Sequence, residues 1–402
     1  MKPYWKSVIL AALLGASFIG CSKEPTAVGA KLFPNGEKFA AHDTTLLAIG
    51  DTTIRSAPIN GGGLNVLVGN QSSVDCKALL RFYISIPESL TRVEIDSARL
   101  SLTVNYSWNT SSPLTPATFD INQVTTPWSA ASVTADSLNG LSLLPTNSSP
   151  ITVTSQDTFT IGKVLTAQID TTLVRKWITL AADTTAADSL IPRFFSIAIE
   201  AHPGLTNAGI WGFTRFGSAT PPSLVVIYHN TWGKDSITLN LGESTFLATG
   251  VPLPSSDYIE VQGGVSIRSR IRFSMKPISD STNKAIINNA TMKLTLNNSS
   301  SLLGVGTEDS LLAFFSGSDA LPDSIQSTKF AYGYRQDASQ TTNSVYIFSI
   351  TTMVQQWINS PSNNFGVALR SLNDFSSVDK LVFYSIKDST RAPNILVTYT
   401  KR

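Results

Sequence analysis

Few side chains in this 402-residue sequence are spaced for catalysis. Histidine, a common general base and metal ligand, occurs only as His42, His202 and His229, with no His-Glu-x-x-His motif. The sequence also lacks a Cys-x-x-Cys pair and a Gly-x-Ser-x-Gly elbow. The glycine run 61–63 is not followed by the Lys-Ser/Thr of a phosphate-binding loop, so we expect a flexible hairpin connection there. We therefore expect a protein that is not an enzyme.

Acidic side chains leave two other kinds of chemistry open. A glycosidase needs two carboxylates that converge in one cleft, and the sequence does not give the separations between Glu200, Glu243 and Glu260. Structural calcium is the one cofactor left open, because loop carboxylates often bind it in β-sandwich modules. The candidate suppliers, none in a run with ligand spacing, are Asp280, Asp319, Asp323 and Asp374.

The amino-terminal segment predicts export. Lys2 and Lys6 form a short positive region, and residues 8–19 form an apolar stretch shorter than the roughly 20 residues of a membrane-spanning helix. We expect a signal peptide over residues 1–20. The segment after it, residues 21–43, has scattered Pro and Gly without sustained periodicity and is expected to be a flexible tether.

The apolar stretch ends in Phe18-Ile19-Gly20-Cys21, which resembles the bacterial lipobox, with Phe18 where Leu is usual. The resemblance implies that a signal peptidase recognises Phe18, Ile19 and Gly20, and that Cys21 is lipidated with fatty acids such as palmitate. Because each buried CH₂ contributes about 0.8 kcal/mol, three acyl chains anchor a protein firmly. Ser22 favours the outer membrane, facing the periplasm or the cell surface. An ordinary secreted protein is the alternative.

The tether would hold the first domain near the membrane, since about 20 flexible residues span roughly 25 Å. Lipidation of Cys21 would leave Cys76 without a disulfide partner, and we assign Cys76 no role.

Charge and composition limit the classes of binding partner that we expect. Without Lys2 and Lys6, the 30 basic residues become 28, equal to the 28 acidic ones. A neutral protein does not attract phosphate backbones over a distance, so we expect no nucleic-acid partner. With 42% hydrophobic and 14% charged residues, the chain should fold into compact domains.

Self-comparison of the sequence reveals two copies of one unit. Residues 171–178 match residues 351–358 at five of eight positions. Further segments match in the same order, namely 195–199 with 365–369, 222–228 with 393–399, and, upstream, 80–82 and 98–102 with 271–273 and 290–294. The repeat predicts tandem domains over residues 44–228 and 236–402. A linker over residues 229–235 would join them, with Trp232 wedged between the domains or exposed.

Each copy has the pattern of an antiparallel β-sandwich. Residues 99–104 and 291–296 alternate polar with apolar side chains, as half-buried strands do. Residues 224–228 and 395–399 are rich in β-branched residues and close each unit. We therefore expect an all-β fold of two tandem jelly-roll-like sandwich domains.

One short helix is expected in each copy. Apolar residues at positions i, i+1 and i+4 of the best-matching segments have helical spacing. Either Asp170 or Thr171 can cap the first helix, and either Ser349 or Thr351 the second. Large aromatic residues on the apolar face of a helix are mostly core residues, and we expect this of Trp177 and Trp357.

The order of these segments resembles the DNRLRE domain, a β-sandwich of large bacterial and archaeal surface proteins that is related to alginate-binding carbohydrate modules. The segments that carry the resemblance are 78–87, 95–100, 126–134, the helix ending at Trp177 and the strand 222–228. Tyr83 and Ser274 replace the acid that usually follows the Phe of the first strand. The resemblance implies a jelly-roll-like fold, an extracellular location and no catalysis by the domain.

Aromatic residues outside the repeated segments are the candidate ligand-binding residues. Glycan-binding sandwiches place aromatic rings against the apolar faces of sugars. We expect Tyr106 and Trp108 in a loop after a strand, and Tyr332 and Tyr334 on one face of a strand. A packing role for each is the alternative.

The sequence thus predicts a non-catalytic surface lipoprotein that binds a polysaccharide or other surface polymer. The alternative is a structural or adhesive protein that binds protein partners and no glycan. Coplanar aromatic rings on one sheet face would favour glycan binding, and a featureless polar face would favour the alternative.

Overall fold

A computed structural model describes residues 40–55, 60–84, 93–108, 116–154, 160–182, 194–205, 207, 209–231, 233–250, 254–279, 285–306, 310–318, 329–337 and 343–401. The first part of the chain contains β1 (Ala41–Arg55), η1 (Asn60–Gly62), β2 (Asn65–Gln71), β3 (Val74–Tyr83), β4 (Glu94–Trp108), β5 (Ala117–Val124), η3 (Ala135–Gly140), β6 (Leu143–Pro145), β7 (Ile151–Val153), β8 (Val164–Gln168), α3 (Thr171–Ala182), β9 (Phe195–Ala201), β10 (Gly209–Thr214), β11 (Ser223–Asn230) and β12 (Gly233–Thr249). The second part contains β13 (Tyr258–Gln262), β14 (Ile267–Phe273), β15 (Ile286–Thr295), β16 (Leu311–Phe315), β17 (Phe330–Gln336), β18 (Val345–Ser349), α4 (Thr351–Asn359), η4 (Pro361–Asn363), β19 (Val367–Ser371), β20 (Lys380–Tyr384) and β21 (Asn394–Thr400).

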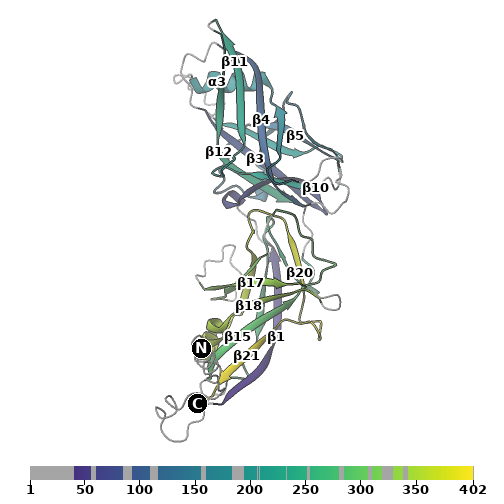
Figure 1. The fold of residues 1–402 in the computed structure, drawn as a ribbon, viewed down its shortest axis with the longest axis vertical. Coiled ribbons are helices and arrows are strands. Elements are labelled where there is room, and N and C mark those ends of the chain that lie inside the picture. The colour runs from purple at the N-terminus through teal and green to yellow at the C-terminus, as the bar shows by residue number, and fades with distance from the viewer. Residues whose placement is uncertain are drawn as a thin grey trace, which may run out of the picture.

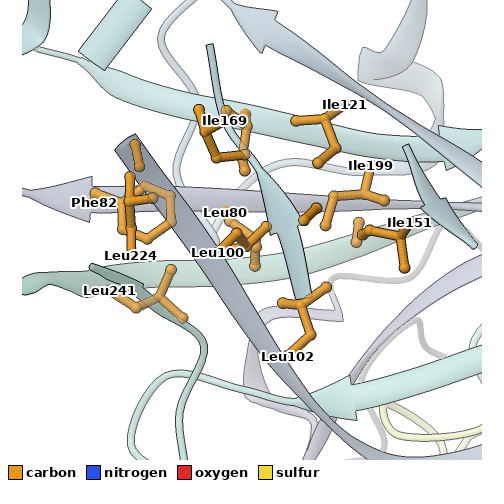
Figure 2. Packing of buried hydrophobic residues seen from close by; sticks show 14 of the residues in the cluster. Leu80, Phe82, Leu100, Leu102, Ile121, Ile151, Ile169, Ile199, Leu224 and Leu241 are labelled. Atoms are coloured by element: carbon orange, nitrogen blue, oxygen red, sulfur yellow. The ribbon is translucent and has the colours of Figure 1, made fainter. Parts of the chain in front are cut away.

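The strands form two antiparallel β units that stack end to end (Figure 1). Each unit has its own hydrophobic core. Figure 2 shows part of the first core, where side chains such as Leu80, Leu100 and Ile199 from different strands point toward one another. The expected all-β, sandwich-like fold is confirmed.

The repeated segments occupy matching positions in the two units. β4 pairs with β8 and β11, as β15 pairs with β18 and β21. β9 pairs with β3, as β19 pairs with β14. The helices also match, because α3 packs against β4 and α4 against β15. Trp177 and Trp357 are buried in the two cores, as expected.

The two helices begin differently. Asp170 caps α3, since its Oδ1 accepts a hydrogen bond from the backbone N–H of Thr172 at 2.8 Å. No side chain caps α4 in this way; the hydroxyl of Thr351 instead accepts a hydrogen bond from the backbone N–H of Ala290 at 2.9 Å. Among the residues described, no helix has the length and apolar character needed to cross a lipid bilayer.

The long strand β1 does not join the unit that follows it in the sequence. β1 pairs with β21 and β14, so the purple strand lies among the green and yellow strands of the lower unit in Figure 1. β12 fills the matching place in the upper unit, between β11 and β3. The N-terminal unit therefore comprises residues 60–249, and the C-terminal unit comprises residues 41–55 and 258–400.

These boundaries differ from the expected ones, 44–228 and 236–402. Each repeat lacks one strand of its own sheet. The first repeat is completed by β12, which follows it in the sequence. The second repeat is completed by β1, which comes before the first repeat. The expected linker 229–235 is instead the end of a β-hairpin, with His229 opposite Lys234 and Asn230 opposite Gly233. Trp232 lies outside the described residues.

β1 closes the sheet of the C-terminal unit. With β1 in place, eight strands form a ring in the order β1-β21-β15-β18-β17-β16-β19-β14. Leu46 is the one residue of β1 that is fully buried, whereas most of its other side chains are exposed or half-buried. β1 is therefore held mainly through its two backbone ladders.

The two units meet over a third apolar cluster, which we call the junction cluster. It includes Leu67 and Phe246 of the N-terminal unit and Ile267 and Val378 of the C-terminal unit. Two glycines of the run 61–63 also pack tightly. A Cβ at Gly61 would overlap the Ala130 carbonyl, and one at Gly63 would overlap the Phe375 carbonyl. Residues 60–62 thus form a tightly packed 3-10 turn, and Gly63 directly after it packs at the junction. This corrects the expectation of a flexible hairpin connection.

Candidate functional site

Three exposed aromatic side chains lie on β17. Phe330, Tyr332 and Tyr334 share the outer face because successive residues of a strand point to opposite sides. Their exposed fractions are 45%, 60% and 62%. On the inner face, Gly333 leaves room for the Phe348 ring, which a Cβ at residue 333 would overlap. We call Phe330, Tyr332 and Tyr334 the aromatic strip.

The strip continues a small apolar cluster on the outer face of the sheet. Leu312 and Phe314 of β16 and Ala368 of β19 are buried there. Phe314 lies opposite Phe330, with 5.7 Å between the ring centroids. The guanidinium carbon of Arg370 is 4.9 Å from the Phe314 ring centroid. The apolar surface is therefore bordered by a cation.

The rings of the strip do not form a flat platform. Phe330 and Tyr332 meet edge to face, at 5.3 Å between centroids and 84° between ring planes. A ligand would therefore meet a ridge of differently tilted rings and not one flat aromatic surface.

The outer face of β15, β21 and β1 forms an open groove of about 530 Å³. β18 alone separates this groove from the strip, since Ile347 pairs with Tyr334 on one side and Lys293 on the other. Figure 1 shows β17, β18, β15, β21 and β1 in this order in the lower unit. β17 and β1 are four strand spacings of about 4.8 Å apart in the closed ring, so the outer surface between them curves around the unit.

The groove offers hydrogen-bonding groups around an apolar floor. It is lined by Asp43, Thr44, Thr45, Asn289, Thr291, Lys293, Leu396, Val397 and Thr398. Leu396 exposes its side chain, and the Thr398 hydroxyl donates a hydrogen bond to Asp43 Oδ1 at 2.6 Å. Hydroxyl, amide and charged groups beside an exposed aliphatic side chain can bind a ligand that has both hydroxyl groups and C–H faces.

The groove exists only because β1 completes the C-terminal unit. Three of its lining residues, Asp43, Thr44 and Thr45, belong to β1. Sequence reasoning missed the groove because no local signal assigns β1 to the distant repeat. It also missed Phe330, although the period of two that grouped Tyr332 with Tyr334 extends to it.

Tyr106 and Trp108 are not ligand-binding residues in this structure. They lie on β4, which runs to residue 108, where a loop was expected. Their exposed fractions are 0% and 1%, and both belong to the junction cluster. Their role is to join the two units, which corrects the expectation that they contact a ligand.

Hydrogen bonds fix both side chains at the junction. Tyr106 donates its hydroxyl proton to Asp379 Oδ1 at 2.9 Å and accepts from the Val378 backbone N–H at 3.3 Å. Trp108 donates its indole N–H to the Leu302 carbonyl at 3.1 Å. Burial, reinforced by the Asp379 carboxylate, raises the pKa of Tyr106 well above its usual value.

The three glutamates considered for catalysis each pair with a cation. Glu200 on β9 pairs with Lys77, Glu243 on β12 with Arg81 at 3.2 Å, and Glu260 on β13 with Lys380 at 3.3 Å. Glu200 and Glu243 belong to the N-terminal unit, whereas Glu260 belongs to the C-terminal unit. Each carboxylate is thus engaged in an ion pair within its own unit.

Asp374 forms a buried ion pair with Arg268 at 2.8 Å. Burial raises the pKa of Asp374, and the Arg268 charge opposes this shift. Asp280, Asp319 and Asp323, the other calcium candidates, lie outside the described residues. Within the described ranges, no three His, Cys, Asp or Glu residues are grouped to hold a metal ion.

The two cysteines differ in what the structure shows. Cys76 is a free, fully buried thiol in the junction cluster, and burial raises its pKa well above the usual value. Such a thiol stays protonated and unreactive in the folded protein. Phe18, Ile19, Gly20 and Cys21 lie outside the described residues.

Comparison of the sequence with models of known protein families and with characterised proteins finds no match. The resemblance to DNRLRE domains therefore stays an expectation drawn from the residues quoted for it.

Proposed function

We propose that this protein is a non-catalytic, membrane-anchored surface lipoprotein whose C-terminal unit binds a polysaccharide. The observation that carries the proposal is the aromatic strip, in which three large rings are exposed side by side on one strand. Contiguous apolar surface of this kind is a mark of binding sites. The anchor rests on the sequence around Cys21.

The groove beside the strip supports a polysaccharide as the ligand. Tyr332 and Tyr334 have apolar ring faces for the C–H groups of sugars and hydroxyl groups for hydrogen bonds. Across β18, the threonine hydroxyls of the groove and Lys293 supply further hydrogen-bonding partners. A chain of several sugar residues can run from the strip across β18 into the adjoining groove.

Affinity electrophoresis of residues 40–402 through gels that contain neutral or acidic polysaccharides tests the proposal. We expect one polymer to retard the protein and the double variant Tyr332→Ala/Tyr334→Ala to migrate freely. The control is Tyr83→Ala, which removes a 71% exposed tyrosine from the N-terminal unit and should leave the retardation unchanged. Residue 40 is the starting point because Asp43 to Thr45 line the groove.

A second candidate is a structural or adhesive protein that binds protein partners. The edge-to-face contact of Phe330 and Tyr332 favours it, since coplanar rings suit sugars better than a ridge does. Unretarded migration of the parent protein in all gels would favour this candidate over the polysaccharide.

A further inference from the structure

The tether expected after Cys21 enters the structure at the far end of the C-terminal unit. Ala41 lies 20 residues after Cys21 in the sequence and pairs with Thr400, the last residue of β21. β1 then runs to the junction, where Arg55 pairs with Ile267 of the junction cluster. Figure 1 shows this course of β1 from the lower end of the lower unit toward the upper unit.

The lengths place the C-terminal unit between the lipid anchor and the N-terminal unit. The 15 residues of β1 span about 50 Å at roughly 3.3 Å per residue. A flexible tether of about 20 residues typically spans only about 25 Å. The N-terminal unit therefore begins farther from Ala41 than the tether usually reaches.

Contacts at the junction keep the N-terminal unit from folding back beside the C-terminal unit. Besides the junction cluster, Ser107 and Val305 form a two-way backbone bridge, with N···O distances of 3.0 and 2.8 Å. Asn65 Nδ2 also donates a hydrogen bond to the Ser376 carbonyl at 2.9 Å. Apolar packing with directional hydrogen bonds fixes the end-to-end arrangement.

We infer that the lipid-facing surface of this protein is the end of the C-terminal unit formed by the starts of β1 and β15 and the end of β21. The N-terminal unit then projects away from the membrane, the reverse of the order expected from the sequence. This inference rests on the proposed anchor at Cys21.

The side chains at this end suit a bilayer surface. Ile286 is 47% exposed and pairs with Thr400, and Lys401 follows Thr400 in the chain. An exposed aliphatic side chain beside a lysine matches the boundary between acyl chains and anionic headgroups.

Energy transfer to labelled lipids in vesicles tests the orientation. The acylated full chain is reconstituted into phosphatidylethanolamine–phosphatidylglycerol vesicles that carry an acceptor-labelled lipid. A donor dye is attached at Asn288→Cys, near the proposed lipid-facing end, or at Lys234→Cys, at the β11–β12 hairpin. Both positions are exposed, and the buried Cys76 should not react with the dye.

We expect transfer from residue 288 to exceed transfer from residue 234 severalfold. Equal transfer, or stronger transfer from residue 234, would overturn the inference while leaving the anchor intact. Cys21→Ser should abolish transfer from both positions. If the acylated chain itself fails to associate with vesicles, the anchor proposal falls, and the orientation falls with it.

Discussion

Tyr106 shows how one side chain couples the two units at the residue scale. Its ring packs in the junction cluster and its hydroxyl bonds to Asp379. We predict that Tyr106→Phe lowers the free energy of unfolding by about 1 kcal/mol at neutral pH, the usual net value of a buried hydrogen bond. Urea denaturation of both proteins measures the difference.

The raised pKa of Tyr106 predicts how this difference changes with pH. An unfolded tyrosine ionises near pH 10, whereas Tyr106 in the folded protein ionises only at higher pH. Its contribution to stability is therefore complete below about pH 10 and declines as the pH rises through the folded pKa. The difference in the free energy of unfolding between the parent and Tyr106→Phe should therefore shrink above pH 10. A constant or growing difference would contradict the raised pKa of Tyr106.

Gly63 allows the close approach of the two units. A Cβ at this position would overlap the Phe375 carbonyl, whereas a Cβ at Gly62 meets nothing within 4 Å. We predict that Gly63→Ala destabilises the protein by about 1–3 kcal/mol through overpacking, and that Gly62→Ala does not. Thermal melts of the two variants check this. Equal midpoints would mean that the junction is looser than the structure shows.

Particular residues also show which placements could be predicted from the sequence and which could not. The period of two correctly placed Tyr332 and Tyr334 on one face, because strand geometry is local. The same reasoning could not place Tyr106 and Trp108. β4 continues to residue 108, and its last residues face the junction cluster, which is a long-range contact without a sequence signal.

At the scale of elements, β1 completes a sheet that is made mostly of residues more than 200 positions later in the chain. We predict that deleting residues 40–55 from the full chain exposes the edges of β21 and β14 to amide exchange. Protection of β3 and β11 in the N-terminal unit should persist, since β12 completes that sheet. Hydrogen–deuterium exchange with mass spectrometry measures both.

The opposite pattern would contradict the strand assignment. If the deletion exposed β3 and β11 and spared β21 and β14, the boundary expected from the sequence, with residues 44–55 in the first domain, would hold instead.

The elements could be predicted better than their assembly. Strand alternation and the spacing of Leu173, Val174 and Trp177 identified strands and a helix that the structure contains. The place of β1 could not be predicted, because residues 41–55 run in polar and apolar blocks that carry no local signal for either unit. The groove could not be predicted either, because its β1 residues lie far in sequence from Lys293 and Leu396.

At the scale of the whole molecule, the two units differ in what they expose. The C-terminal unit carries the aromatic strip and the groove, and by our inference it also lies nearer the membrane. The N-terminal unit would project away from the membrane, held in place by the contacts at the junction. A polysaccharide bound at the strip would then be held close to the membrane in which we propose that the protein is anchored.

The most direct test of the account is calorimetric titration of residues 40–402 with the polysaccharide that retards it most strongly. We predict measurable binding that weakens at least about tenfold in Tyr332→Ala/Tyr334→Ala, a loss of ~1.4 kcal/mol or more. The Tyr83→Ala control should bind like the parent. Equal affinity of the double variant and the parent, or no binding by the parent, would contradict polysaccharide recognition by the aromatic strip.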